Sequence, residues 1–289
     1  MNEFDVELKA RRFVDEAGVS SLPIDLALYR AKVEAKLLVD DTLPAQEAGY
    51  TLRVGKRALI HVNGKDRPER QRFTECHEVA HLSLGLDSQH DFGSSWSYAR
   101  RPANEIACDV FAAELLLPYR LFRAHAAQRP ATIETVEILR NEFAASREAT
   151  ASRLAATSKE PCAYVLSEGG QVQHLVRSPS MRTANAWIAR GTQLHSQSVA
   201  HQLRQAGSLS RTATVAGDVW FADWNDVALT ESSYYSESFD QTLSVIVCED
   251  PDELAEVRTD HATREDRSHG GLLDELDGTL PWPGGKRRR

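Results

Sequence analysis

The segment from Glu69 to Leu86 constrains the fold most, because it runs without proline or glycine until Gly85. Its spacing of apolar residues predicts a buried helix that ends at that glycine. The segment contains His77-Glu78-Val79-Ala80-His81, an H-E-x-x-H motif. Four residues are slightly more than one helical turn, so both imidazoles leave the same face and can share one tetrahedral metal ion.

Glu78 follows the first histidine and in this motif points toward the open side of the metal. There it can accept a proton from a metal-bound water, so the segment has the parts of a zinc hydrolase. The alternative is that two histidines and a glutamate merely decorate a helix. Buried groups of this kind would be costly without a metal or a partner, which favours the metal site.

A third ligand could come from two places. Asp87 lies six residues after the second histidine, but the glycine expected between them is missing. Glu105 and Asp109 lie four residues apart on a second predicted helix, which puts both carboxylates on one face. We favour Glu105 as the ligand, with Asp109 holding the second nitrogen of a ligand histidine. Glu114 would point about 180° away from Glu105, so we expect it to be structural or on the surface.

The rest of the chain predicts an α+β protein. Two helices are expected within 2–33, a small antiparallel sheet from strands at 36–39, 49–54 and 58–63, and a helical pair with helix-turn-helix spacing at 132–157. Beyond Pro161 we expect strands at 163–166, 172–176, 218–221 and 242–247, and helices at 184–188 and 199–203. The predicted domains are a metal-binding domain at 1–130, a helix-turn-helix-like segment at 131–160, a C-terminal α+β domain at 161–250 and a disordered acidic tail at 251–289.

Charge and composition exclude several classes of protein. The 34 Lys and Arg against 42 Asp and Glu give a net charge of −8, so we do not expect direct DNA binding through general attraction to phosphate. No apolar run is long enough to span a membrane, and the N-terminus lacks a signal segment, so we predict a cytoplasmic protein without a membrane partner. The four cysteines form no CxxC pair, which excludes a cysteine-rich zinc module.

Two linked motifs make the chain similar to a known family. From Arg70 to His81 it reads R-x-x-F-T-x-x-H-E-x-x-H, and from Glu105 to Pro118 it reads E-x-x-x-D-x-F-A-A-x-L-L-x-P. In this order the motifs resemble those of the ImmA/IrrE-type metallopeptidases, over about residues 20 to 160. The departures are Asp109 for the common Asn, Leu117 for Met, and Val79-Ala80 for Leu-Gly. None of them removes a catalytic atom.

The resemblance implies a zincin-like domain and a bacterial zinc endopeptidase of the gluzincin type. Such an enzyme would cut a helix-turn-helix repressor and release stress, DNA-damage or mobile-element genes. His77, His81 and Glu105 would bind zinc, or manganese in the cell, while Glu78 would be the general base and Asp109 would orient a histidine. The C-terminal domain would be a regulatory or sensor domain, as in some members of the family.

A peptide substrate must be held in an extended conformation, and for this we expect an exposed sheet edge at Leu59–Val62. Tyr98, Tyr119 and His125 are the candidates for stabilising the oxyanion. Cys76 and Cys108 flank motif residues, and we expect both to be buried and inert.

Two rival functions come from other classes. The first is a DNA-binding regulator with a structural metal, in which 132–157 reads DNA, although four glutamates there offset Arg140, Arg147 and Arg153. The second is a toxin–antitoxin or prophage partner protein that acts by binding alone.

Overall fold

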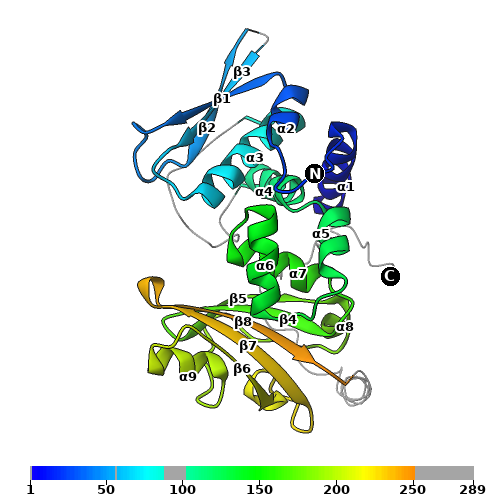
Figure 1. The fold of residues 1–289 in the computed structure, drawn as a ribbon, viewed down its shortest axis with the longest axis vertical. Helices are drawn as coiled ribbons and strands as arrows, with labels where there is room; N and C mark the ends of the chain where they lie inside the picture. Colours follow the sequence, from blue (N-terminus) through cyan, green and yellow to red (C-terminus); the bar gives the residue numbers. More distant parts are fainter. Residues whose placement is uncertain (1, 56, 88–101, 251–289) are drawn as a thin grey trace, which may run out of the picture. The chain divides into compact units, whose positions relative to one another are not determined.

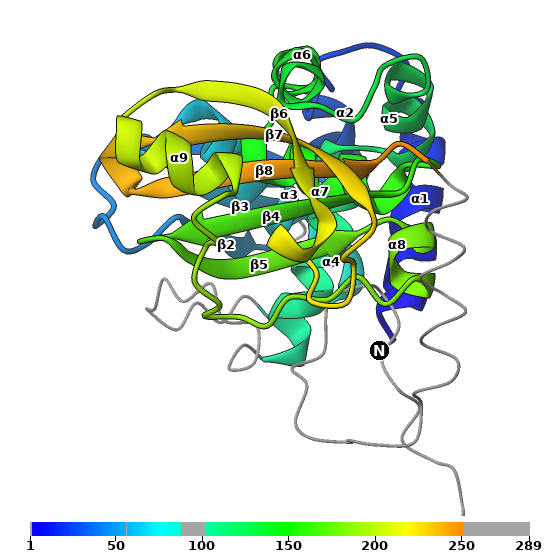
Figure 2. The ribbon, with the colours of Figure 1, turned by 90° about the horizontal axis from the view of Figure 1, so that it is seen from below.

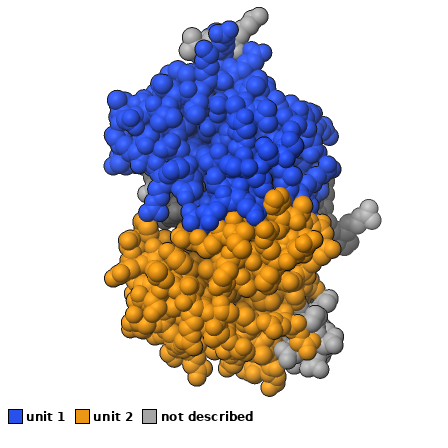
Figure 3. All heavy atoms as spheres, in the orientation of Figure 1, with its two compact units in different colours: residues 1–122, 140–146, 278–289 blue, residues 123–139, 147–277 orange. Residues whose placement is uncertain are grey.

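A computed structural model describes residues 2–55, 57–87 and 102–250. Within these residues the chain forms two compact units, coloured separately in Figure 3. The first unit contains residues up to Phe122 together with Arg140–Ser146. The second contains Arg123–Leu139 and the described residues from Arg147 to Asp250. The predicted segment 131–160 is therefore shared between the two units, and the domain boundaries drawn from the sequence remain predictions.

Helices form the framework of the first unit. The helix α1 (Glu3–Ala17) packs on α4 (Ala103–Leu116), and α4 packs on α3 (Pro68–Leu84). Proline at the first position of α3 fits the start of a helix, and Gly85 ends it in the left-handed conformation with φ 66°, donating its N–H to the His81 carbonyl. The predicted motif helix is thus present. The bounds of the helices up to residue 157 are α1 Glu3–Ala17, α2 Ala27–Lys32, α3 Pro68–Leu84, α4 Ala103–Leu116, α5 Tyr119–Ala126, α6 Ile133–Phe143 and α7 Arg147–Thr157.

A three-stranded sheet lies against α3 (Figure 1). Its strands are β1 (Ala35–Asp40), β2 (Gly49–Val54) and β3 (Arg57–Asn63), in the order β1-β3-β2. The expected antiparallel sheet is wrong in one pairing, since β1 and β3 are parallel while β2 and β3 are antiparallel. The chain crosses from one edge to the other after β1, and β3 then enters between them. This places the most buried strand, with Ile60 and Val62 inaccessible, at the centre.

The central place of β3 corrects a second expectation. Leu59–Val62 was predicted to be an exposed edge, yet it is paired on both sides. The edge strands are β1 and β2, and only β2 of these two has extensive contacts with the motif helix.

The second unit is built on a five-stranded antiparallel sheet in the order β5-β4-β8-β7-β6. The helix α7 covers one face, and α9 lies on the other (Figures 1 and 2). With α3 and the first sheet, this confirms the α+β fold class. The elements after residue 160 are β4 Cys162–Glu168, β5 Gln171–Arg177, α8 Pro179–Thr183, α9 Val199–Ala206, β6 Ser210–Ala216, the 3-10 turn η2 Gly217–Val219, β7 Ala228–Ser236, the 3-10 turn η3 Glu237–Phe239 and β8 Gln241–Cys248.

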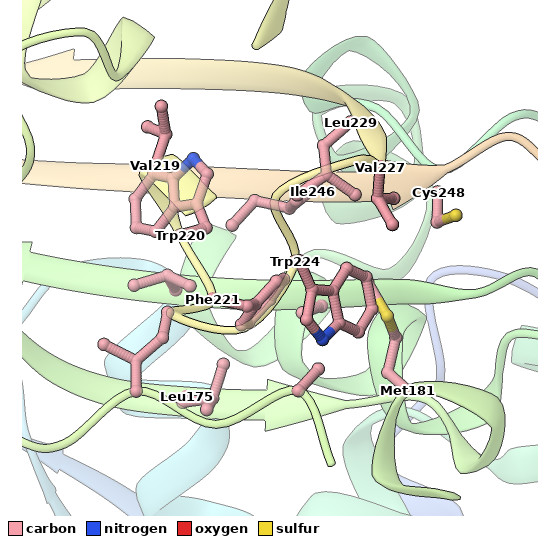
Figure 4. Packing of buried hydrophobic residues seen from close by; sticks show 14 of the residues in the cluster. Leu175, Met181, Val219, Trp220, Phe221, Trp224, Val227, Leu229, Ile246 and Cys248 are labelled. Atoms are coloured by element: carbon pink, nitrogen blue, oxygen red, sulfur yellow. The ribbon is translucent and has the colours of Figure 1, made fainter. Parts of the chain in front are cut away.

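Aromatic side chains fill the core of the second unit (Figure 4). Trp220, Phe221 and Trp224 are all buried there. Residues 218–221 were predicted to be a strand, which is wrong: the chain turns at η2. In a strand Trp220 and Phe221 would point to opposite faces of the sheet, whereas a turn can insert both side chains into the same core. The prediction of a helix at 184–188 is also wrong. The helix α8 lies earlier, at Pro179–Thr183, and the Ser178 side chain caps its start.

None of the described helices has the length and apolar character that a membrane crossing requires.

Candidate metal centre

The helices α3 and α4 bring two imidazoles and one carboxylate together. His77 Nε2 lies 3.0 Å from His81 Nε2 and 3.1 Å from Glu105 Oε2. His81 Nε2 lies 3.5 Å from Glu105 Oε1. All three side chains are buried. The two helices therefore direct their ligand atoms toward one point, although His81 and Glu105 are 24 positions apart along the chain.

These distances fit a divalent cation. Zinc bonds to nitrogen and oxygen of about 2.0–2.1 Å in a tetrahedron place neighbouring ligand atoms about 3.3 Å apart. The three separations in the structure, from 3.0 to 3.5 Å, bracket that value. Among the described residues, this is the one group of three or more His, Cys, Asp or Glu side chains that meets the geometry of a metal site. Asp87, the other candidate for the third ligand, is outside that group.

Asp109 lies on the far side of the first imidazole. Its Oδ1 is 2.9 Å from His77 Nδ1, while Glu105 faces Nε2 of the same ring. The i, i+4 spacing on α4 thus places one carboxylate at each ring nitrogen. An acceptor at Nδ1 fixes the tautomer in which Nε2 is the free ligand nitrogen.

The local charges follow from this arrangement. Burial lowers the pKa of His77, but hydrogen bonds with Asp109 and Glu105 outweigh it and raise the pKa to about 9. Burial likewise opposes ionisation of Glu105, yet hydrogen bonds from His77 and His81 bring its pKa well below the usual range. Without a cation, the carboxylates therefore favour a proton on the His77 imidazole, and a bound cation would take over that stabilising charge.

Glu78 lies in the same region, on the side of the edge strand β2. It is fully buried, and its Oε2 accepts a hydrogen bond from Thr51 Oγ1 at 2.7 Å. Sequence reasoning missed Thr51, because it lies in an ordinary strand pattern 27 residues from its partner. No local spacing signal links the two positions.

The other singled-out residues have structural surroundings. Glu114 is buried and accepts the backbone N–H of Tyr119 at 2.8 Å, and it also lies 3.9 Å from Arg11 Nε. The Tyr119 ring lies under the Arg11 guanidinium at 4.4 Å. His125 is on α5 in the second unit, and Tyr98 is outside the described residues. Glu114 therefore ties α4 to the start of α5.

Both thiols near the motifs are buried. Burial raises the pKa of Cys76 and of Cys108 above that of an ordinary thiol. They are therefore protonated and shielded, which is the inert state expected from the sequence.

Comparison with known proteins finds a family model for part of the chain and solved structures of similar fold. Residues 32–155 match the family model of the IrrE N-terminal-like domain, Peptidase_M78. A solved structure of a Mycobacterium tuberculosis transcriptional regulator is similar in fold, with a TM-score of 0.59 and 17% sequence identity over 93% of this chain and 94% of that chain. At this identity the likeness concerns the fold alone. No curated protein matches the sequence.

Proposed function

Residues 32–155 belong to the IrrE N-terminal-like domain family, and from this premise we propose that the protein is a zinc-dependent endopeptidase that cleaves a helix-turn-helix transcriptional repressor. The observation that carries the proposal is the convergence of His77, His81 and Glu105 at 3.0–3.5 Å beside the buried Glu78. A structural zinc site is usually closed by four protein ligands, whereas three leave a position for water. The site has three.

The chain's own groups have distinct tasks in peptide hydrolysis. A bound zinc ion supplies Lewis-acid activation of water and of the scissile carbonyl. His77, His81 and Glu105 would hold it, and Asp109 holds the His77 ring by its Nδ1–H. Glu78 accepts a proton from the attacking water at its carboxylate and donates it to the leaving amine nitrogen. Manganese could occupy the same ligand set, because affinity order alone does not select the cation.

The peptide would be held on β2. Among the residues that the structure describes, this strand pairs with β3 alone and so has an open edge, and Thr51 joins it directly to Glu78. An extended peptide could add to that edge through main-chain hydrogen bonds. A repressor offers such a segment where a linker leaves its folded DNA-binding domain. The family resemblance and the name of the fold neighbour, a transcriptional regulator, support a substrate that controls transcription.

A DNA-binding regulator is the second candidate, favoured by the name of that fold neighbour. The helical pair α6 and α7 argues against it. Arg140 pairs with Glu69 at 2.7 Å, and Arg147 pairs with Glu137 and stacks on the Tyr234 ring at 4.1 Å. Arginines held in this way are not free to meet phosphate groups without first losing those partners.

Incubation of the full-length protein with a helix-turn-helix repressor encoded beside its own gene tests the proposal. With zinc or manganese, gel analysis should show cleavage of the repressor by the wild-type protein. Glu78→Gln should reduce the rate by about 10² to 10⁴-fold, since a general base contributes that much. Glu134→Gln is the matched control, because Glu134 is exposed on α6. Equal cleavage by Glu78→Gln, or an intact repressor with the wild type and both metals, would contradict the proposal.

A further inference from the structure

We propose that Thr51 is a positioning residue that orients Glu78 from the strand on which the peptide would bind. The inference rests on the proposed peptidase function. It adds that β2, the strand on which the peptide would bind, also orients the general base Glu78. Thr51 Oγ1 donates to Glu78 Oε2 at 2.7 Å, and the carboxylate is fully buried. Hydrogen bonds to an ionised group are roughly twice as strong as those between neutral groups, so this contact constrains the carboxylate.

The register of the sheet explains why Thr51 reaches the helix. Thr51 pairs with Ile60 of β3, which is completely buried. Directly paired residues point to the same face of a sheet, so both side chains face α3. Glu78 lies on that helix, and the β2 hydroxyl is therefore placed over it by the backbone register rather than by a flexible loop.

Gly49 sets the distance between strand and helix. It is two residues before Thr51 and so on the same face. A Cβ atom at Gly49 would lie 2.4 Å from the His61 carbonyl oxygen and 2.6 Å from Thr74 Cγ2 of α3. Any larger residue would push β2 away from the helix. The glycine thus allows β2 to lie close to α3, and at this distance Thr51 can donate a hydrogen bond to Glu78.

The contact has a consequence for catalysis. A hydrogen bond to one carboxylate oxygen restricts rotation of the carboxylate, and a base must be well oriented to accept a proton efficiently. The hydrogen bond to Glu78 links Thr51 to the site. Since β2 would also hold the peptide, base and scissile bond would be aligned on the same strand, and removing the hydroxyl should slow turnover without weakening substrate binding.

Kinetics of three variants separate this role from a merely structural one. Thr51→Val should lower kcat about tenfold, the effect of losing a hydrogen bond to a charged group, and should change KM less than about twofold. Thr51→Ser keeps the hydroxyl and should recover most of kcat. Thr214→Val, at an exposed threonine of β6, is the matched control. An unchanged kcat for Thr51→Val, or a Thr51→Ser variant as slow as Thr51→Val, would overturn the inference.

A thermal double-mutant cycle tests the contact without turnover. Tm is measured for the zinc-loaded wild type, Thr51→Val, Glu78→Ala and the double variant. If the two side chains are coupled, the double variant should lose less Tm than the sum of the single losses. Additive losses would overturn the inference. A wild type that cleaves no peptide refutes the peptidase proposal instead, and the cycle then still decides whether Thr51 holds Glu78.

Discussion

Removal of the Asp109 carboxylate should weaken zinc binding without removing any ligand atom. Asp109 Oδ1 lies 2.9 Å from His77 Nδ1, and both side chains are buried. Without the acceptor, the ring can rotate or place its proton on Nε2, the nitrogen that must bind the cation. Loss of such an outer partner typically costs about 10 to 100-fold in metal affinity, which is about 1.4 to 2.7 kcal/mol. Burial argues for the upper part of that range, because water has little access to replace the carboxylate.

Competition against a chromophoric zinc chelator at fixed pH measures this loss. Asp109→Ala should bind zinc about 30 to 100-fold more weakly than the wild type. Asp109→Asn keeps an acceptor oxygen but loses the charge, so its loss should be about tenfold or less. Asp218→Ala removes an exposed carboxylate from the second unit and should leave the affinity unchanged. If Asp109→Ala holds zinc as tightly as the wild type, the ring is fixed by its packing, and the argument from the carboxylate is refuted.

Two further predictions concern the second unit. Glu231→Gln should lower the free energy of unfolding by about 3 kcal/mol in urea titrations followed by tryptophan fluorescence, because the amide group would face donors that now bind a carboxylate. These donors are Trp220 Nε1 and the first backbone N–H groups of α9, at 2.7 to 2.9 Å, and an unchanged midpoint would contradict the prediction. Hydrogen bonds from Arg204 lower the pKa of Asp240. These bonds therefore stabilise the fold fully above the pKa of the carboxyl in the unfolded chain, and the stabilisation is lost as the pH falls through the lowered pKa of the folded protein. Arg204→Gln should thus reduce the free energy of unfolding more at about pH 6 than at about pH 3. Equal effects at both pH values would count against this pair.

The motif helix could be predicted from the sequence because its determinants are local. The absence of glycine before Gly85, and the i, i+4 spacings of His77 with His81 and of Glu105 with Asp109, depend only on helix geometry. The favoured third ligand also followed from a spacing on one helix. Spacing alone does not show that Glu105 meets the histidines, because this depends on the packing of α3 on α4. For that packing the family resemblance was the guide.

The strand order could not be predicted in the same way. The apolar pattern identified all three strands of the first sheet, but a pattern of burial does not say which neighbours a strand has. In the structure β3 lies between β1 and β2, so the open edge beside Glu78 belongs to β2. Thr51 escaped notice for the same reason, since its contact with Glu78 depends on that order and on the register with Ile60.

The strands β6 and β7 were missed for different reasons: no residue of β6 is buried, and several buried positions of β7 are polar. In β7, Glu231, Ser232 and Ser233 are all buried, which hides the alternation that identifies a strand. Ser233 Oγ donates to Glu231 Oε1 and also lies 2.7 Å from Ser244 Oγ. Such a row is tolerable only because its members satisfy one another across the sheet, and a linear pattern contains no sign of those partners.

The position of the imidazoles depends on contacts that no motif includes. On the side of α3 away from the ligands, the buried Glu75 pairs with Arg30 of α2, and Arg72 donates to the Ile24 carbonyl at 2.8 Å. These bonds resist rotation of α3 about its own axis. A turn of one residue would move each side chain by about 100° and carry His77 and His81 away from Glu105. The anchoring of α3 to the segment before β1 is therefore as necessary to a shared cation as the histidines themselves, although the two lie far apart in the sequence.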